Sequence, residues 1–486
     1  MRHVLKFNRG SAAITAVVLT GLLAGCSLAP QFVRPAAPVA EVFPAADTNT
    51  DASARRAIDT GWRNFFPDPR LQTLIETALT NNRDLRSAAL RIDEARALYN
   101  IQQADLLPNV NLGASGSRAR VLSTQGSNNG NSRTVVGSNY QVGLSLASFE
   151  LDFFGRVHSL NEAVLAQFLA TDAARQSVQI SLVAAVAQAY LSERSLAEQL
   201  ALAQSTAEGR QTGYALAKQR FDVGASSALD VRLSETLVLS ARAAAVMLQR
   251  QRAQAQNALT LLVGRTLADL PPTQLLSSET VVTGIPAGLP SDLLTNRPDI
   301  RAAEQRLRAA NANIGAARAA FFPRITLTAG LGTASTALSG LFDAGSGTWS
   351  FGPQLLLPIF DAGRNSANLT LAQVRTNLAV VDYEKTIQVA FREVADALVA
   401  RGTLDEQIVA QQAFLDATAD RLRLADLRYK NGIASSLDVL DAQRELFAAQ
   451  QALVQTRLLR LTNAVDLYRS LGGGILAQSV PLASAR

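Results

Sequence analysis

The chain has 486 residues, 48% of them hydrophobic and only 6% aromatic, and its formal net charge is +6. A single cysteine excludes a disulfide within one chain, and two histidines supply too few groups for nucleophilic or metal-based catalysis, so we expect no enzyme activity, metal site or cofactor. No run of lysine and arginine is interleaved with aromatic side chains, which argues against a nucleic-acid partner.

The N-terminal residues predict a signal peptide over 1–25. Basic residues up to Arg9 precede the apolar run Ala12–Leu23, which is too short to span a bilayer. The run ends in Leu23-Ala24-Gly25-Cys26, which resembles the lipobox of bacterial lipoproteins. After cleavage Cys26 would carry acyl chains on its thiol and amino group, and two or more such chains anchor a protein stably. Ser27 follows where an inner-membrane retention signal usually has aspartate, so we expect sorting to the outer membrane.

The rest of the chain contains one pattern twice. The segment Arg220–Val231 recurs 208 residues later as Arg428–Val439, with six of twelve positions identical. Asp152–Arg156 and Asp361–Arg364 end at the same separation of 208 residues. These marks occur in the same order in both halves, so the sequence predicts a duplicated architecture.

Each half begins with a predicted helix that ends before a proline, Leu71–Ala104 or Ser291–Ala320. Two stretches of strict apolar–polar alternation follow, which predict strands with one apolar and one polar face. Loops rich in glycine, serine and asparagine or threonine join them, Ser123–Ser132 and Thr333–Gly347. The apolar positions are Val110, Leu112 and Ala114; Tyr140, Val142, Leu144 and Leu146; Ile325, Leu327, Ala329 and Leu331; and Trp349, Phe351 and Leu355.

Long helices are predicted next, because no proline interrupts the chain between Pro108 and Pro271 or between Pro358 and Pro481. The helical stretches Arg156–Arg220 and Arg364–Arg428 would each extend about 95 Å at 1.5 Å per residue. Shorter helices return after glycine turns, over Val231–Val263 and Val439–Tyr468. Rods of this length must pack against other helices, so we expect an array of elongated helical hairpins in a bundle or tube.

The strands suit a membrane pore built from several copies. Each is about the length that crosses a bilayer when tilted, but an open four-stranded sheet would leave its edge N–H and C=O groups unsatisfied in lipid. Four strands are too few to close a barrel, since the smallest membrane barrels use about eight. A barrel closed by several copies would turn its polar face inward, around a water-filled lumen. The alternative is an ordinary soluble sheet packed on helices.

Four segments resemble outer-membrane efflux proteins of the TolC-like family, which work with resistance–nodulation–division (RND) pumps: Phe149–Arg156, Asn296–Arg301, Leu357–Arg364 and Leu437–Arg444. The resemblance implies an α+β membrane protein in which a homotrimer builds one 12-stranded transmembrane β-barrel, a long periplasmic α-barrel and an equatorial belt. It implies passive conduction of small molecules, such as drugs, toxic compounds or metal ions. The implied partners are a periplasmic adaptor protein, an inner-membrane RND-type pump and outer-membrane lipid.

The expected organisation follows from the two repeats and the segments left between them. A lipid-anchored extension with an equatorial part would follow the signal peptide, and an equatorial linker would join the repeats. The ranges are 1–25 for the signal peptide, 26–68 for the extension, 69–266 for the first efflux repeat, 267–290 for the linker, 291–470 for the second repeat and 471–486 for the tail.

The resemblance also implies a periplasmic gate at the two turns that contain Gly224 and Gly432. Asp438 and Asp441 match paired acidic positions at the constriction of the family, and Leu437 matches a hydrophobic closure position. Asp230 and Tyr429 match partners in hydrogen bonds between hairpins. The family often has a basic residue just after the turn glycine, where this chain has Ile433-Ala434. Any lock would therefore use Arg428, Arg444 or Tyr429.

Plainer roles stand beside these. Ser227 with Asp230, and Ser435 with Asp438, fit a capping box at a helix start. The two glycines would then simply end helices, and Asp441 would be a solvated surface residue. At the level of the whole protein, a structural coiled-coil lipoprotein and the outer-membrane exit duct of a protein-secretion system remain as alternatives.

Overall fold

In the computed structural model of the protein, the described residues are 27–44, 56–123, 133–266, 270–272, 276, 280–288 and 290–478. The predicted signal peptide, Cys26 and nearly all of the loop predicted over Ser123–Ser132 lie outside them. The chain divides into two compact units. The strand unit comprises Met1–Pro35, Asp93–Thr171 and Ala303–Asp382, and the hairpin unit comprises Ala36–Ile92, Asp172–Ala302 and Tyr383–Arg486.

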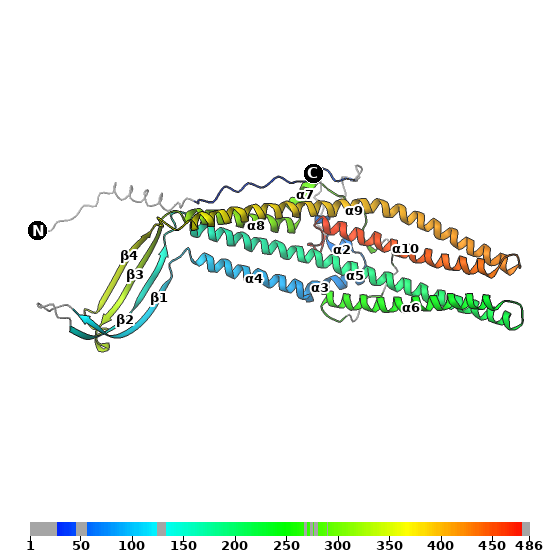
Figure 1. Cartoon of the computed structure of the whole chain (residues 1–486), viewed down its shortest axis with the longest axis horizontal. Helices are drawn as coiled ribbons and strands as arrows, with labels where there is room; N and C mark the ends of the chain where they lie inside the picture. The colour runs from blue at the N-terminus through cyan, green and yellow to red at the C-terminus, as the bar shows by residue number, and fades with distance from the viewer. Residues whose placement is uncertain are drawn as a thin grey trace. The chain divides into compact units, whose positions relative to one another are not determined.

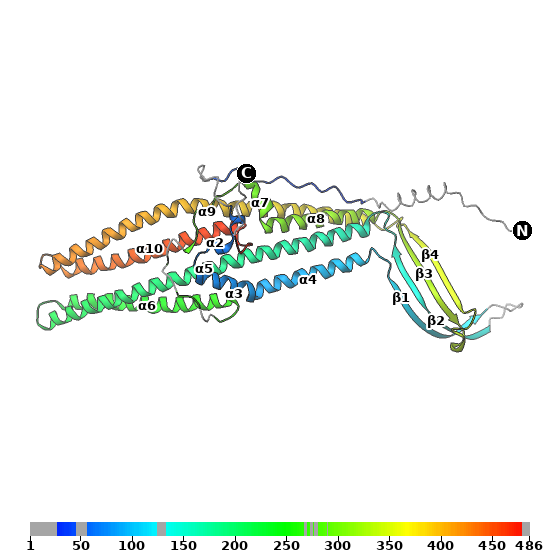
Figure 2. The ribbon, with the colours of Figure 1, turned by 180° about the vertical axis from the view of Figure 1, so that it is seen from behind.

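The same order of elements occurs twice along the chain (Figure 1). The first set is α4 (Arg83–Ala104), β1 (Val110–Ser123), β2 (Arg133–Glu150), α5 (Arg156–Asp222) and α6 (Ala228–Val263). The second set is α8 (Pro298–Ala319), β3 (Arg324–Ser335), β4 (Gly347–Leu356), α9 (Arg364–Lys430) and α10 (Ser436–Ser470). Both α5 and α9 contain 67 residues. The predicted strands, long helices and returning helices are confirmed. Figure 2 shows that, within the hairpin unit, α5 forms one hairpin with α6 and α9 forms another with α10.

The four strands form one antiparallel sheet in the strand unit, in the order β1-β2-β3-β4. Its register joins the predicted apolar positions in rows: Leu112 pairs with Leu144, Leu144 with Leu331, and Leu331 with Trp349. Alternate residues of a strand point to opposite faces, so the predicted apolar positions all lie on one face. Serine, threonine, glutamine and glycine residues dominate the other. The amphipathic sheet predicted from the sequence is therefore confirmed.

The first helix of each repeat differs from the prediction, because it is two helices rather than one. The first break is at Asn82, between α3 (Pro69–Asn81) and α4, where the Asn82 side chain accepts from the amide of Leu85 at 2.9 Å and donates to the carbonyl of Leu262 at 2.9 Å. The second break is at Arg297, between α7 (Pro290–Asn296) and α8. Proline at the next position, Pro298, disfavours helical backbone at Arg297. None of the helices in the described ranges is long and apolar enough to cross a membrane.

In the core of the hairpin unit, aromatic side chains from segments far apart in the chain pack together. Phe65, at the end of α2 (Trp62–Phe65), stacks on Tyr468 with ring centroids 3.9 Å apart, and Tyr468 donates a hydrogen bond of 2.6 Å to the carbonyl of Thr60. Backbone hydrogen bonds join α2 to Val282 and to Leu476. The N-terminal extension, the linker and the tail thus meet on the helices of this unit. That they form an equatorial belt stays a prediction. Two short 3₁₀ helices complete the described elements, η1 (Ala57–Asp59) and η3 (Leu338–Gly340).

Candidate functional site

The two turns at the ends of the hairpins share one geometry. Gly224 and Gly432 have φ angles of 75° and 73°, in the left-handed region that glycine adopts without strain. In each turn the amide after the glycine donates to a carbonyl five residues earlier, at 2.7 Å and 2.9 Å respectively, as in a Schellman cap. The helix-ending role of both glycines is thereby confirmed. Arg428, which supplies the second of these carbonyls, has an exposed side chain.

Asp230 joins the two hairpins and also caps α6. The Ser227 hydroxyl accepts from the amide of Asp230 at 3.2 Å, and the Asp230 carboxylate accepts from the amide of Ser227 at 3.1 Å, which completes the predicted capping box. The other carboxylate oxygen accepts from the hydroxyl of Ser436, at the start of α10. The pKa of Asp230 is lowered, mainly by the hydrogen bond from Ser436 and then by those from Ser227.

The second predicted capping box is absent. Ser435 is the N-cap of α10, but its side chain makes no capping hydrogen bond, so the prediction for Ser435 and Asp438 is wrong. The hydroxyl of the next residue, Ser436, donates to Asp230, and Asp438 is exposed. Leu437 beside it is 56% exposed.

Tyr429 makes the second link between hairpins. The guanidinium of Arg220 donates a hydrogen bond of 2.6 Å to its phenol oxygen and lies 5.2 Å from the centre of its ring. The resemblance pointed to Tyr429 as a partner between hairpins, and the structure places it there. Arg220 was not expected in this role, although its place in the repeated segment was visible in the sequence.

Asp441 lies one turn beyond Asp438 and binds two arginines of its own chain. Arg421 on α9 donates to its carboxylate at 2.8 Å, and Arg444 on α10 also pairs with it. Arg421 reaches Glu445 as well. The hydrogen bond from Arg421, and then the charge of Arg444, lower the pKa of Asp441. Arg444 was among the predicted partners, whereas Arg421 was missed because it lies in α9, twenty residues earlier in sequence.

A buried arginine lies deeper between the hairpins. Arg210 on α5 is 6% exposed, and burial lowers its pKa. It donates to the carbonyl of Leu237 on α6 at 3.1 Å and to that of Gln443 on α10 at 3.4 Å, and it lies 5.3 Å from the ring centre of Phe447. A small cavity of about 140 Å³ between the hairpins is lined by Arg210 and Asp230 among others. Hydrogen bonds from Arg210 thus join α5 to α6 of its own hairpin and to α10 of the other.

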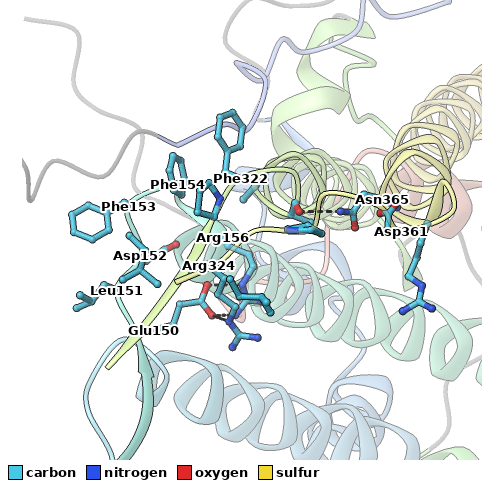
Figure 3. Close-up of a pocket in the computed structure, with 17 residues that line it drawn as sticks. Glu150, Leu151, Asp152, Phe153, Phe154, Arg156, Phe322, Arg324, Asp361 and Asn365 are labelled. Atoms are coloured by element: carbon cyan, nitrogen blue, oxygen red, sulfur yellow. Dashed lines mark hydrogen bonds and ion pairs between the residues drawn. The ribbon is translucent and has the colours of Figure 1, made fainter. Parts of the chain in front are cut away.

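A separate charged cluster lies in the strand unit, where strands pass into helices (Figure 3). Glu150 at the end of β2 accepts two hydrogen bonds of 2.7 Å from Arg156 at the start of α5, and Arg324 at the start of β3 approaches it to 2.6 Å. Phe154 stacks on Phe322 beside them, with ring centroids 4.8 Å apart. The cluster ties the end of β2 to the starts of β3 and α5.

The two aspartates of the repeated junction motif cap the long helices. Asp152 accepts from the amide of His158 at 2.7 Å, and Asp361 accepts from the amides of Gly363 and Asn365, both at 2.9 Å. The hydrogen bond from Asn365 is the largest cause that lowers the pKa of Asp361. The repeated Asp–Gly–Arg pattern thus encodes a helix start.

No group of His, Cys, Asp or Glu side chains within the described ranges could hold a metal ion. His158 is exposed and lies 3.2 Å from Glu162, one turn further along α5. Neither feature suggests a reacting centre. What the geometry offers is a set of helix ends, held by exchangeable hydrogen bonds, and an amphipathic sheet.

Comparison with known proteins identifies a family. The model of the outer membrane efflux protein family matches residues 74–265 and 289–473. The probable efflux pump outer membrane protein TtgC of Pseudomonas putida is 48% identical over 472 residues, 96% of either chain. Outer membrane protein OprJ of Pseudomonas aeruginosa is 46% identical, over 95% of either chain. The open state of the MtrE outer membrane channel of Neisseria gonorrhoeae superposes with a TM-score of 0.85 and 43% identity, over 94% of this chain and 100% of that one.

Proposed function

This chain belongs to the outer membrane efflux protein family, and we propose that three copies of it form one passive export duct through the outer membrane. The protein is an outer-membrane channel component of an efflux system, with the TolC-like fold of mixed helices and strands. The finer statements below concern its assembly, its anchor, its gate and its partners.

The sheet carries the proposal of a trimeric barrel. Within the described strands, β1 and β4 each have one neighbour, so both edges of the sheet are open. Its apolar face is uncovered, with Leu112, Trp349 and Phe351 at 75%, 79% and 64% exposed. An open edge cannot lie in hydrocarbon, and the even strand numbers of membrane barrels begin at eight. Three copies of four strands would close a 12-stranded barrel with the apolar face toward lipid and the polar face toward the lumen.

The N-terminal segment supports the proposed lipid anchor at Cys26. Residues 27–35 lie along α8 in the strand unit. Asn311 donates to the carbonyl of Pro30 at 2.8 Å, and Arg34 pairs with Glu304 at 2.8 Å. Arg318 donates to the carbonyl of Leu28 at 3.2 Å. The segment after Cys26 is therefore held on the unit that carries the strands, which suits an anchor in the same membrane. Cys26→Ser should abolish labelling by radioactive fatty acid, and equal label in both proteins would refute the anchor.

The hairpin ends support a periplasmic gate. The links Arg220–Tyr429 and Asp230–Ser436 join the hairpins through exposed or half-exposed hydrogen bonds, each of which contributes only about 1 kcal/mol and can be exchanged. Asp441 would add one carboxylate per copy to a ring, and its two arginines would set how much of that charge faces the lumen. A periplasmic adaptor and an inner-membrane RND-type pump would deliver small molecules to this end.

Reconstitution tests the duct directly. Detergent-extracted protein should be a trimer by native mass spectrometry and should give stepwise conductance in planar bilayers. A monomer would refute the assembly, and a trimer without conductance would favour a structural lipoprotein. Deletion of the gene should sensitise cells to small toxic compounds. If it instead removes proteins from the culture medium, the duct serves protein secretion.

A further inference from the structure

The two strand pairs differ sharply in charge. From Leu106 to Phe149 the chain contains no aspartate or glutamate, but it contains Arg118, Arg120 and Arg133. The second strand pair, from Ile325 to Phe360, contains no lysine or arginine. Apart from Arg324, the first residue of β3, which pairs with Glu150 at the end of β2, all arginines of the strands are therefore on β1 and β2.

Two of these arginines lie on the apolar face of the sheet. Arg118 and Arg120 are an even number of residues from Val110 and Leu112, so their side chains leave β1 on the same face. Arg118 is paired across the strands with Ser138, and Arg120 with Val136. Both arginines are exposed, and Arg120 donates a hydrogen bond of 3.4 Å to the hydroxyl of Thr134. In the proposed barrel this register turns both arginines toward lipid and away from the lumen.

Their position along β1 matches the far edge of a bilayer. Eight residues separate Val110 from Arg118, which is roughly 27 Å along a strand. At a tilt of about 40°, Arg118 and Arg120 would lie roughly 20 and 25 Å further along the membrane normal than Val110, close to the ~25 Å height of the apolar band of outer-membrane barrels. Val110 adjoins the helical end of the sheet, so the arginines belong to the opposite, outer boundary.

Tyr140 marks the same boundary independently. It is paired with Gly116, one step before Arg118 on this face. Its ring covers that glycine, since a β-carbon at Gly116 would lie 3.1 Å from the Tyr140 ring. Tyrosine is enriched where hydrocarbon meets headgroups, because its ring is apolar and its hydroxyl polar. On β1 and the residues paired with it, this face is thus aliphatic up to Ala114, then carries Tyr140, and then the two arginines, with Val136 opposite Arg120.

We propose that Arg118 and Arg120 form a docking surface for the phosphate groups of a phosphorylated glycolipid in the outer leaflet. The proposal rests on the membrane-spanning barrel argued above. Arginine carries a planar fork of donors that binds phosphate with two hydrogen bonds, and its stem can lie along acyl chains while its head reaches the headgroups. Because these side chains lie beside the aliphatic face, a phosphate carried on a lipid would be brought to them by its acyl chains, whereas a soluble anion would not. Three copies would place six such arginines around the barrel.

Lipid titration followed by native mass spectrometry tests the surface on the full-length trimer. The probes are bis-phosphorylated lipid A, the same lipid without its phosphates, and inorganic phosphate alone. Wild-type trimer should bind lipid A at least tenfold more tightly than Arg118→Gln/Arg120→Gln trimer, and should bind the dephosphorylated lipid as weakly as that variant does. Arg118→Lys/Arg120→Lys, which keeps the charge but loses the fork, should fall between them.

A matched control removes two exposed arginines outside the strands, Arg91→Gln/Arg375→Gln, and should bind lipid A as wild type does. If wild type and Arg118→Gln/Arg120→Gln bind lipid A equally, or if the control loses as much binding as that variant, the proposed docking surface is wrong. A trimer mass in the same spectra would still support the duct. Inorganic phosphate that displaces lipid A at equal concentration also overturns the docking surface, because the site would then bind free anion. Monomers in the same spectra would instead refute the proposed assembly, and the docking surface with it.

Discussion

The guanidinium of Arg220, near the end of α5, donates a hydrogen bond of 2.6 Å to the phenol oxygen of Tyr429, near the end of α9. The two residues lie on different hairpins, and Arg220 is the repeat counterpart of Arg428, the residue just before Tyr429. The duplication therefore supplies the same short segment twice, and the fold sets an arginine from one copy against an aromatic ring from the other. The link is exposed, so it can break without disturbing the core.

Tyr429→Phe removes this hydrogen bond and keeps the ring, over which the Arg220 guanidinium lies. We expect a looser pair of hairpins and a higher mean conductance in planar bilayers, with trimer yield unchanged. Tyr99→Phe removes a phenol oxygen that belongs to the strand unit and to neither turn, and serves as the control. Wild-type conductance in Tyr429→Phe would show that the contact has no part in gating.

Asp441→Asn should raise conductance and weaken cation preference, because a ring of carboxylates attracts cations and asparagine removes their charge. The pKa of Asp441 is lowered by Arg421 and Arg444, so the carboxylate stays charged as pH falls and takes up a proton only below the ordinary range of aspartate, about 4. Its contacts with the two arginines are therefore present at and above pH 5 and lost in stronger acid.

It follows that the difference between wild type and Asp441→Asn should be the same at pH 7 and pH 5. Asp416→Asn, an exposed position elsewhere on α9, is the control and should conduct as wild type does. A difference that vanishes at pH 5 would mean that the carboxylate is protonated there, which requires a raised pKa and contradicts the lowered one. If wild type and Asp441→Asn conduct identically at pH 7 and at pH 5, Asp441 lies away from the pore.

The regular parts of this fold were predictable because each follows from a local period. The alternation of Leu112 with its polar neighbours specifies which face of β1 is apolar, and the strand register then aligns it with Leu144. The lengths of α5 and α9 follow from the absence of proline and the presence of the turn glycines. Neither inference needs knowledge of a distant contact.

Contacts between helices were not predictable, since they depend on how far one helix is shifted along another. Arg421 reaches Asp441 only because α9 and α10 pack in one particular register. The break at Asn82 likewise depends on a carbonyl 180 residues away, that of Leu262. A capping box, by contrast, looks identical in sequence at Ser227 and Ser435, but only the first forms. At the second helix start, it is the next hydroxyl, that of Ser436, that makes a hydrogen bond, to Asp230 on the other hairpin.

That difference between the two helix starts gives a paired prediction. Ser227→Ala removes the hydroxyl that caps α6 and should lower the free energy of unfolding by about 1 kcal/mol. Ser435→Ala removes a hydroxyl that makes no capping bond and should change it by less than about 0.5 kcal/mol. Thermal unfolding of the two trimers, followed by circular dichroism, compares them directly. Equal losses would mean that Ser435 does cap α10.

The remaining prediction concerns Arg297, which the sequence marked only as part of a family-like helix start. Its side chain is 9% exposed and pairs with Asp299 at 2.5 Å and with Glu393 at 2.9 Å, and it donates to the carbonyl of Ser470 at 3.1 Å. One guanidinium thus joins the start of α8 to the middle of α9 and to the last residue of α10.

Arg297→Met keeps most of the volume but leaves Glu393 and the buried carbonyl of Ser470 without this donor. Removal of one partner from a buried ionic group costs about 3–5 kcal/mol, more than most single substitutions. We expect little folded trimer in the outer membrane. Arg297→Lys should recover part of it, because an ammonium group can serve one or two of the three acceptors but not all in their present geometry. Arg301→Met, one turn later and exposed, should yield trimer as wild type does. Quantification of heat-resistant trimer on gels decides the matter, and wild-type yield from Arg297→Met would show that the three helices are held together by other contacts.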